Sequence, residues 1–466
     1  MKSIPSNFVF ALFCLMIYFT TALCYDEINI IQYPVTSRPA IIEQGWQFTI
    51  QCKAPQSIAN WKVGISTPYI RFNNLDIQTS FDNVTSLWTL IANVPLNVPF
   101  ELYDLEVTYD GRTDHVSHAV KIIQSFKKNY YFIHLADLHM PSVAWIGYID
   151  YEDKNSAAEF LQILDELSII NPEFVLQTGD VVDNGMLEDQ FQIVHELFAR
   201  ADVPMFVTAG NHDVWHEGHD LWHKYFSPIM DYSFNYGEHH YAGMEMYLVP
   251  TPTFKANQIL WLQNDLRVSI ADGNKFNTLF YHYDESKQID ANFVDEFSVD
   301  LVCYGHTHRN DKSTVGARNT LNLNTAATMN DNGEYRLIKI ADNHVQEYPL
   351  IKFKNLSVNY SPANDGTNWK VRASIINRND VNFENGLIKF YVRHDGAGYS
   401  ISGGELAQFI ETDSVDVYYV NVNILANSNQ EVNIISNNPP TNNPPEIVHV
   451  EPAENPKIEA GVSYTF

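Results

Sequence analysis

The periodicity of hydrophobic and polar positions changes twice along the chain. Over residues 25–127, short segments alternate apolar and polar side chains, as in WQFTIQC (46–52), SLWTLIA (86–92) and LYDLEVTY (102–109), and turn residues separate them. Alternation with a period of two is typical of a β-strand with one buried face, and no long helical period interrupts it. We therefore predict an all-β sandwich domain at residues 25–127.

From residue 129 onward, apolar runs alternate with amphipathic helical segments. Runs at 131–136, 174–177 and 205–207 are separated by two helical faces, formed by Phe160, Leu161, Leu164 and Leu167, and by Leu187, Phe191, Val194 and Phe198. This βαβαβ order predicts a sheet of parallel strands with helices on its faces. Further runs at 248–249, 278–281, 301–303 and 321–323 extend the predicted α/β domain over residues 128–345. Because right-handed crossovers bring the carboxyl ends of such strands to one edge, the polar residues that follow the runs should meet there.

The third part of the chain returns to short alternating strands. Segments at 369–375, 387–392 and 415–422 predict a second β-sandwich domain at residues 346–436. Residues 437–466 begin with NNPPTNNPP, which predicts a stiff polar linker followed by the start of an incomplete module. The predicted fold is thus an α/β core flanked by two all-β sandwich domains, which we expect to be immunoglobulin-like.

Residues 1–24 have the layout of a secretory signal peptide. Lys2 precedes an apolar run at 8–19, and Ala22-Leu23-Cys24 places small residues before the expected cleavage point. We expect cleavage after Cys24 and a secreted, extracellular or lumenal mature protein; the alternative is that the segment is kept as an anchor. No later apolar run reaches the ~20 residues that a spanning helix needs, so we expect no transmembrane span in the mature chain.

The cysteines and glycosylation sequons bear on the same compartment. Only Cys52 and Cys303 remain in the mature chain, in different predicted domains, so we expect no disulfide framework. Cys303 lies in an apolar run, and we expect it to be a buried thiol. Sequons at Asn83, Asn355 and Asn359 predict a glycoprotein.

Composition and charge exclude several classes of protein. The 466 residues are 45% hydrophobic and 18% charged, which excludes a disordered chain and a coiled coil. The chain has 29 Lys and Arg against 56 Asp and Glu, a formal net charge of −27. A chain this acidic repels phosphate backbones, so we expect no nucleic-acid partner. Converging carboxylates can still bind metal cations.

Five polar clusters in the α/β part lie at the end of an apolar run or just after one. They are Asp137-Leu-His139, Gly179-Asp180-Val-Val-Asp183-Asn-Gly185, Gly210-Asn211-His212-Asp213, His282, and Gly305-His306-Thr-His308. Carboxylate oxygens and imidazole nitrogens are common ligands of divalent metals, and a pair of metals ~3.5–4 Å apart needs one carboxylate that bridges both. The sequence therefore predicts a metal site at the carboxyl edge of the sheet.

In type and order, these clusters resemble the motifs of the calcineurin-like metallophosphoesterase family. The DxH, GDxxD, GNHD, isolated His and GHTH elements appear in the family's order within residues 130–340, less than half of the chain. The resemblance implies a βαβ-sandwich core and a hydrolase acting on phosphoric ester bonds. It also implies two divalent metal ions and a metal-bridging hydroxide as the nucleophile. The substrate would be a phosphomonoester or phosphodiester, either a small molecule or a lipid head group.

The resemblance also implies a role for each residue of the clusters. One metal would be held by Asp137, His139, Asp180 and His308; Asp180 would bridge to a second metal, which Asn211, His282 and His306 would complete. The catalytic residues would be His212, which protonates the leaving alcohol, and Asp183, which holds the His212 ring through its other nitrogen. These ligands accept Mn, Zn, Fe or Co, so the identity of the metals stays open.

The sequence differs from the motifs of two branches of the family, and these differences argue against membership of either branch. A redox-active iron purple acid phosphatase would carry Tyr at the position of Asp183 and Glu after its GNH motif, and this chain has neither. Ser/Thr protein phosphatases lack the closing GHTH motif and carry Arg at the position of Asn184.

An alternative from another class is a cell-surface or extracellular binding or adhesion protein. Its β domains would contact extracellular protein partners, and its metal site would be structural.

Some candidate residues remain outside this set. A second His-rich stretch consists of His216, His219, His223, His239 and His240. It has no pattern of carboxylate partners, so we expect surface or pocket-rim positions there and no metal. We expect Asp213 to support a turn. The connection at 140–155, which contains Trp145, Tyr148 and Tyr151, is long for a βα loop; it is either a substrate-facing flap or a plain surface loop.

Overall fold

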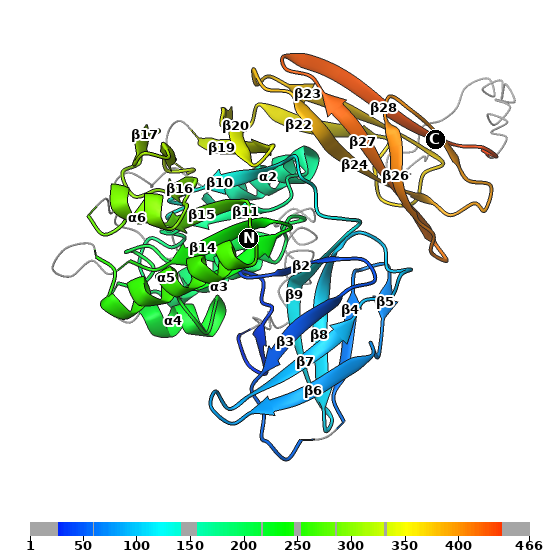
Figure 1. Cartoon of the computed structure of the whole chain (residues 1–466). Helices are drawn as coiled ribbons and strands as arrows, with labels where there is room; N and C mark the ends of the chain where they lie inside the picture. The colour runs from blue at the N-terminus through cyan, green and yellow to red at the C-terminus, as the bar shows by residue number, and fades with distance from the viewer. Residues whose placement is uncertain are drawn as a thin grey trace, which may run out of the picture.

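Two mixed β-sheets form the core of the α/β part of the molecule, which lies at the left in Figure 1. The computed structural model describes residues 27–58, 60–140, 156–215, 218–246, 253–284, 287–329 and 333–439. The first sheet has the order β12-β11-β10-β19-β20, with β21 also paired to β19. Its strands are β10 (Tyr130–Leu135), β11 (Val175–Thr178), β12 (Met205–Thr208), β19 (Glu334–Ala341), β20 (His344–Glu347) and β21 (Leu350–Lys352). We call residues 128–352 the central segment.

The second sheet of the central segment has the order β13-β14-β15-β16-β18-β17. Its strands are β13 (Tyr232–Tyr236), β14 (His239–Met244), β15 (Phe276–Tyr281), β16 (Leu301–Tyr304), β17 (Lys312–Val315) and β18 (Thr320–Asn324). Strands β10, β11 and β12 run parallel in the first sheet, as do β14, β15, β16 and β18 in the second. Aromatic side chains, including Phe132, Phe174 and Tyr241, fill one buried cluster to which both sheets contribute.

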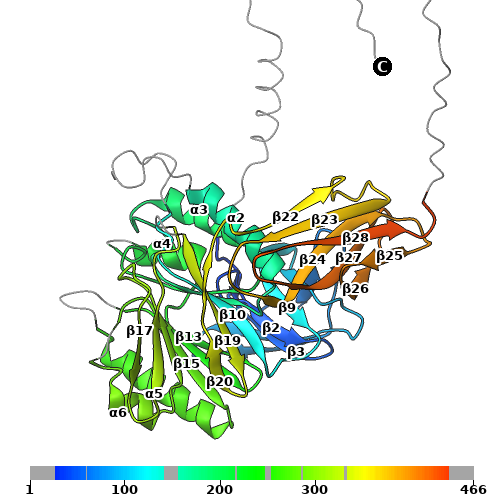
Figure 2. The ribbon, with the colours of Figure 1, turned by 90° about the horizontal axis from the view of Figure 1, so that it is seen from above.

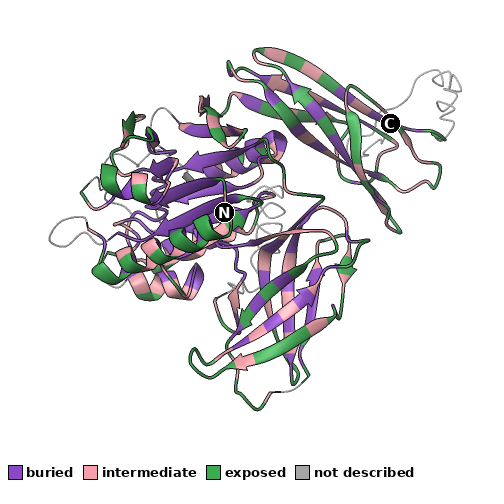
Figure 3. Ribbon diagram, in the orientation of Figure 1, coloured by how far each residue is buried: buried purple, intermediate pink, exposed green. Residues whose placement is uncertain are grey.

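Helices cover the outer faces of the two sheets. The first sheet is covered by α2 (Ser156–Ile170), α3 (Glu188–Phe198) and α4 (Gly218–Tyr225), and the second by α5 (Ala256–Ala271) and α6 (Ala291–Glu296). Phe160, Phe191 and Trp222 from the first three helices pack in one buried cluster with strand residues such as Val175. The strands between the helix layers are almost wholly buried, whereas α5 exposes its outer face (Figure 3). This layered α/β sandwich agrees with the βαβ-sandwich core that the resemblance implies.

An all-β part precedes the central segment. One of its sheets has the order β1-β3-β7-β6 and the other β2-β9-β8-β4-β5. The strands are β1 (Ile31–Tyr33), β2 (Ala40–Glu43), β3 (Gln47–Cys52), β4 (Lys62–Ser66), β5 (Arg71–Phe72), β6 (Ile77–Asp82), β7 (Leu87–Asn93), β8 (Leu102–Tyr109) and β9 (Arg112–Ile123). Residues of both sheets, such as Ile50, Leu90 and Leu105, form one buried cluster because each strand buries alternate side chains.

A second all-β part follows the central segment. Its sheets have the orders β22-β23-β28-β25 and β24-β27-β26. The strands are β22 (Leu356–Ser361), β23 (Lys370–Asn377), β24 (Phe383–Arg393), β25 (Tyr399–Ser402), β26 (Glu405–Ile410), β27 (Val415–Ile424) and β28 (Ser428–Ser436). Its buried residues, such as Ile388 and Val432, belong to the same cluster as Phe160 of α2. The C-terminal β part and the central segment therefore share a continuous core, and Figure 2 shows α2 beside β24.

All three parts of the chain meet at Lys389 of β24. Its Nζ lies 3.2 Å from Glu101 Oε2 in the N-terminal β part and 3.3 Å from Asp202 Oδ2 in the central segment. The Tyr419 hydroxyl donates a hydrogen bond to the same Glu101 carboxylate. Burial by itself raises the pKa of Glu101, but the ammonium groups of Lys389 and Lys121 lower it to about 2. The junction therefore pairs a buried, ionised carboxylate of the N-terminal β part with a lysine that also contacts the central segment.

The structure confirms most of the expected strands and helices, and it adds some that the pattern did not indicate. The expected strands at 46–52, 131–136, 301–303 and 415–422 are present as β3, β10, β16 and β27. The expected run at 248–249 lies outside the described residues. The pattern missed β14, which consists of the His-rich residues 239–244, and the antiparallel strand β19. The immunoglobulin-like topology of the two β parts stays a prediction. Within the described residues, no helix is long and apolar enough to cross a membrane.

Candidate metal centre

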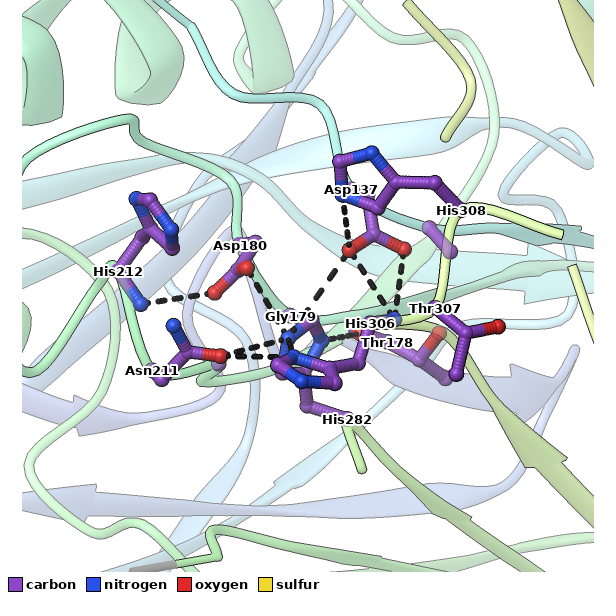
Figure 4. Close-up of polar contacts among 12 residues, drawn as sticks. Asp137, Thr178, Gly179, Asp180, Asn211, His212, His282, His306, Thr307 and His308 are labelled. Atoms are coloured by element: carbon purple, nitrogen blue, oxygen red, sulfur yellow. Dashed lines mark hydrogen bonds and ion pairs between the residues drawn. The ribbon is translucent and has the colours of Figure 1, made fainter. Parts of the chain in front are cut away.

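The five predicted motifs all follow strands of the central segment and converge in space (Figure 4). Asp137 and His139 come after β10, Asp180 after β11, Asn211 and His212 after β12, His282 directly after β15, and His306 and His308 after β16. These strands are neighbours in two sheets that pack face to face. Their carboxyl ends therefore bring the polar side chains to one edge, as the sequence predicted.

The main chain bends sharply at these residues. Five of them have positive φ angles between 43° and 68°, the left-handed region that residues with a Cβ rarely adopt: Asp137, His139, Asp180, His306 and His308. Each such residue costs of order 1 kcal/mol, and such strain clusters at functional sites. The motif glycines permit close packing of these bends. A Cβ on Gly210 would lie 2.2 Å from Asp180 Oδ1.

Asp137, His139 and His308 form the first group of side chains that could hold a metal ion. Their closest side-chain nitrogens and oxygens all lie within 4.8 Å of one another. His308 Nε2 is 3.3 Å from Asp137 Oδ1, and His139 Nε2 is 3.1 Å from His308 Nε2. The Asp137 carboxylate is wholly buried and also accepts a hydrogen bond from the His306 main-chain N–H at 2.9 Å. This bond joins the GHTH loop to the strand that carries Asp137.

Asp180, His282 and His306 form a second group within the same 4.8 Å limit. His282 Nε2 lies 3.0 Å from Asp180 Oδ2 and 3.2 Å from His306 Nδ1. The Asn211 amide oxygen is 3.1 Å from His282 Nε2 and 3.0 Å from His306 Nδ1. On its other edge the His282 ring donates from Nδ1 to the Thr178 carbonyl at 2.8 Å, so the Nε2 lone pair faces the cluster.

The donor set fits divalent metal ions. Imidazole nitrogens face each other at 3.1 Å in the pair His139–His308 and at 3.2 Å in the pair His282–His306, and each pair can share only one proton. The carboxylates favour positive charge here. Burial alone would lower the pKa of His282, but Asp180 and Asp137 raise it to about 10. Burial alone would likewise raise the pKa of Asp180, but the charge of His282 holds it well below its ordinary value. A bound cation would satisfy these carboxylates in place of the protons.

His212 lies on the Asp180 side of the cluster (Figure 4). Its main-chain N–H donates to Asp180 Oδ1 at 2.8 Å, and its side chain is 27% exposed, whereas the His139 and His282 side chains are almost wholly buried. Its ring is also close to the ligand atoms, because a third group within 4.8 Å combines His139, Asp180 and His212. The partly exposed His212 ring is thus within reach of solvent and of a substrate, as is the His308 ring, whose side chain is 37% exposed.

The structure corrects the expected contact between Asp183 and His212. The ring of His212 donates from Nδ1 to the main-chain carbonyl of Asp183 at 2.6 Å, while the Asp183 carboxylate lies 4.0 Å from that nitrogen. The carboxylate lies nearer to the His139 ring, with 3.6 Å between Oδ1 and Nδ1. The His139 Nδ1 atom is buried and makes no hydrogen bond among the described residues. Asp183 is therefore placed to support a ligand residue, and its backbone orients His212.

Two supporting residues hold the loops in place. Asp213 is wholly buried and accepts hydrogen bonds from the main-chain N–H groups of Val182 and Gly210, at 2.9 and 2.7 Å, which agrees with its expected role in a turn. Gln190 of α3, also wholly buried, accepts from the N–H groups of Asp183 and Asn184 at 3.0 and 2.8 Å. The sequence reasoning missed Gln190. The sequence feature that could have indicated Gln190 is its position as a polar side chain next to the apolar face of the predicted helix that contains Phe191.

The second His-rich stretch does not behave as one unit. His239 and His240 were expected at the surface or a pocket rim, and this was wrong, since both are buried in β14. His239 bonds to Tyr130 and Asn343, and His240 bonds to Asn235 and Asp265. Among the others, His219 and His223 are partly exposed on α4. His216 and nearly all of the 140–155 connection lie outside the described residues.

The family model for calcineurin-like phosphoesterases matches residues 130–310, which contain all of the motifs above. The chain therefore contains a calcineurin-like phosphoesterase domain with a divalent metal site. It is a phosphoester hydrolase. No curated protein matches the sequence of this chain.

Several solved structures are similar to parts of this chain. A purple acid phosphatase from yellow lupin (Lupinus luteus) seeds is 12% identical, with a TM-score of 0.44, and the match covers 66% of this chain and 72% of that chain. PhoD is 10% identical, with a TM-score of 0.37, over 78% of this chain and 88% of that chain. A single mutant of Vps29 from Entamoeba histolytica is 15% identical, with a TM-score of 0.23, over 48% and 99% of the two chains. Likenesses of this size say nothing about the substrate.

Proposed function

We propose that this protein is a dinuclear metal-dependent phosphoesterase that hydrolyses phosphomonoesters or phosphodiesters. The observation that carries the proposal is the arrangement around Asp180. One carboxylate lies within reach of both groups of ligand atoms, and the partly exposed His212 is bonded to it through its main-chain N–H. A purely structural metal site is usually closed by protein ligands and needs no neighbouring proton donor. A bridging carboxylate beside an accessible imidazole supports hydrolysis.

Each residue has a defined task in this proposal. Asp137, His139 and His308 would hold one divalent ion, Asn211, His282 and His306 would hold the other, and Asp180 would bridge them. When bound, the two ions would activate a water molecule and neutralise the charge on the phosphate oxygens. The ligand types accept Mn, Zn, Fe or Co.

His212 would act on the leaving group. Because its Nδ1–H is bonded to the Asp183 carbonyl, Nε2 is the atom that can face a substrate. A protonated Nε2 can donate its proton to the departing alkoxide oxygen, as a general acid does. Asp183 would keep the His139 ring in its ligating orientation.

Metal stoichiometry tests the bridging role of Asp180. Elemental analysis of purified Asp180→Asn should show loss of both ions, whereas Asn211→Ala should lose mainly one, because Asp180 is the carboxylate that this proposal assigns to both ions. Asp220→Asn, which changes an exposed carboxylate on the nearby helix α4, is the matched control and should retain both ions. Two ions retained in Asp180→Asn would contradict the bridging assignment.

Turnover separates the enzyme from the binding-protein alternative. We expect the metal-loaded protein to hydrolyse p-nitrophenyl phosphate or bis-p-nitrophenyl phosphate in the presence of added manganese. The ratio of the two rates would distinguish a monoesterase from a diesterase. If neither ester is hydrolysed while metal is bound, the extracellular binding or adhesion protein becomes the better proposal, with partners contacted by the β parts.

We also propose export and glycosylation. The motivation is the signal-peptide layout of residues 1–24, which lie outside the described residues, together with the sequon at Asn83. Asn83 lies in the turn between β6 and β7, where residues 82–86 are all exposed. An oligosaccharide could be attached there without disturbing the core. Enzymatic removal of N-glycans should lower the mass of the secreted protein, and Asn83→Gln should reduce that shift.

A further inference from the structure

An exposed tryptophan lies directly beside the proposed proton donor. The ring of Trp215 contacts the ring of His212 edge-on, with 6.0 Å between centroids and an interplanar angle of 77°. Its exposed fraction is 53%, although an indole is among the side chains with most to gain from burial. The aromatic ring thus lies at an accessible side of the centre, next to the partly exposed imidazole of His212.

The backbone around Trp215 is fixed at both ends. On one side, the carboxylate of Asp213 anchors the motif by accepting hydrogen bonds from Val182 and Gly210. On the other side, the Gly218 N–H donates to the Trp215 carbonyl at 3.1 Å. Gly218 packs so closely on Asp213 that a Cβ at this glycine would lie 2.0 Å from the Asp213 carbonyl oxygen. The described residues on either side of Trp215 are therefore held by hydrogen bonds and close packing, which favours a preorganised contact.

We infer that Trp215 forms a leaving-group subsite that binds esters whose alcohol part carries a planar aromatic ring. This inference rests on the proposed function, because it uses His212 as the proton donor. A proton donor must lie next to the ester oxygen that departs, so the alcohol part of the substrate lies on the His212 side. Trp215 is the described aromatic residue whose ring contacts His212 and is more than half exposed. An indole stacks with planar rings whatever their substituents. One such contact typically changes affinity by roughly 5- to 100-fold.

A pair of substrates that differ only at the distal end of the alcohol tests the subsite. Phenylpropyl phosphate and n-propyl phosphate leave as primary alkoxides of similar basicity, so His212 should serve both equally. We expect Trp215→Ala to lower kcat/KM for the phenylpropyl ester by roughly 5- to 100-fold and for the propyl ester by less than about 2-fold. Trp215→Phe should retain most of the preference. If the protein hydrolyses only diesters, the corresponding phenylpropyl and propyl diesters are used as the substrate pair.

The control is another exposed tryptophan far from the centre. Trp46 precedes β3 in the N-terminal β part and is 66% exposed, so Trp46→Ala should leave kcat/KM unchanged for both esters. Equal effects of Trp215→Ala on both esters would overturn the subsite and leave the phosphoesterase standing.

A binding measurement keeps the two proposals distinguishable if turnover is absent. Phenylpropylphosphonate and propylphosphonate cannot be hydrolysed, and their binding to the metal-loaded protein can be measured by calorimetry. The aromatic phosphonate should bind more tightly to the wild type and lose that advantage in Trp215→Ala. If the wild type binds both phosphonates equally, the subsite is wrong whatever the fate of the phosphoesterase proposal. If the aromatic preference is present but no ester is hydrolysed, the subsite stands and the hydrolytic function fails.

Discussion

His212 donates a hydrogen bond from Nδ1 to the main-chain carbonyl of Asp183, with 2.6 Å between the two atoms. A backbone carbonyl cannot be protonated or removed by exchanging a side chain, so it fixes the tautomer of the ring without adding a negative charge. The Asp183 carboxylate lies closer to His139 than to His212. One residue thus supports two imidazoles through different atoms, and the two effects can be separated by mutation.

Replacing His212 should separate catalysis from metal binding. We expect His212→Ala to keep both ions and to lose on the order of 10²–10⁴ in kcat, the range typical of a lost general acid. The defect should be large for an alkyl phosphate and smaller for p-nitrophenyl phosphate, because p-nitrophenolate departs with little need for a proton. Kinetics on both esters, together with elemental analysis, checks this. Loss of an ion would instead identify His212 as a ligand, in agreement with its distance to His139 and Asp180.

Asp183→Asn should act through His139 and leave His212 in place. The substitution keeps the backbone carbonyl that holds the His212 ring but removes the negative charge near His139 Nδ1. Loss of such a supporting carboxylate typically weakens metal affinity by about 10- to 100-fold. The variant should therefore need more metal for activity, and at saturating metal its dependence on the leaving group should match the wild type. A leaving-group profile like that of His212→Ala would show that the carboxylate serves His212 after all.

Glu166 of α2 should make stability depend on pH. Burial raises the pKa of its carboxyl to about 7, although the Tyr335 hydroxyl and the Lys354 N–H bond to it and favour the ionised form. In the unfolded chain the pKa of this carboxyl is near its ordinary value. Between about pH 4.5 and 7 the folded state therefore binds more protons than the unfolded state. The free energy of unfolding should fall as the pH rises through this range, by about 3 kcal/mol in total. Glu166→Gln can keep the hydrogen bond to Tyr335 without a charge. Urea unfolding should show the variant to be more stable at pH 8 and similar to the wild type near pH 4.5; the same difference at both pH values would exclude this explanation.

The junction at Lys389 should be sensitive to charge. Lys389→Met leaves the buried Glu101 carboxylate without its nearest cation, since the side chains of the pair are only 14% and 10% exposed. Breaking a buried ion pair on one side typically costs about 3 kcal/mol or more, and Lys121 offsets part of this. Adding Glu101→Gln should recover much of the loss in urea unfolding. A double variant no more stable than Lys389→Met would mean that the side-chain packing of Lys389, and not its charge, stabilises the junction.

The types and order of the ligand residues could be predicted from the sequence because they follow local rules. Apolar runs of strand length followed by Asp, Asn or His specify strands with polar carboxyl ends, and parallel connections bring such ends to one edge. Asp137, Asp180 and His282 were therefore expected together, and the structure brings them together. The same local rules failed for β14, where His239 and His240 interrupt an otherwise apolar strand. Their partners, among them Tyr130 and Asp265, lie far along the chain.

The sequence by itself determined which side chains are present for metal binding and most of the segments that form strands and helices. Only the tertiary structure decided which atoms meet: the Asp183 carbonyl with His212, its carboxylate with His139, and Trp215 beside the exposed ring. It also decided that α2 shares a core with the C-terminal β part and that Lys389 contacts both other parts. The physical reason is that periodicity reports burial along one segment. Contacts between segments depend on backbone turns, such as the left-handed bends at Asp137 and Asp180, that leave no period in the sequence.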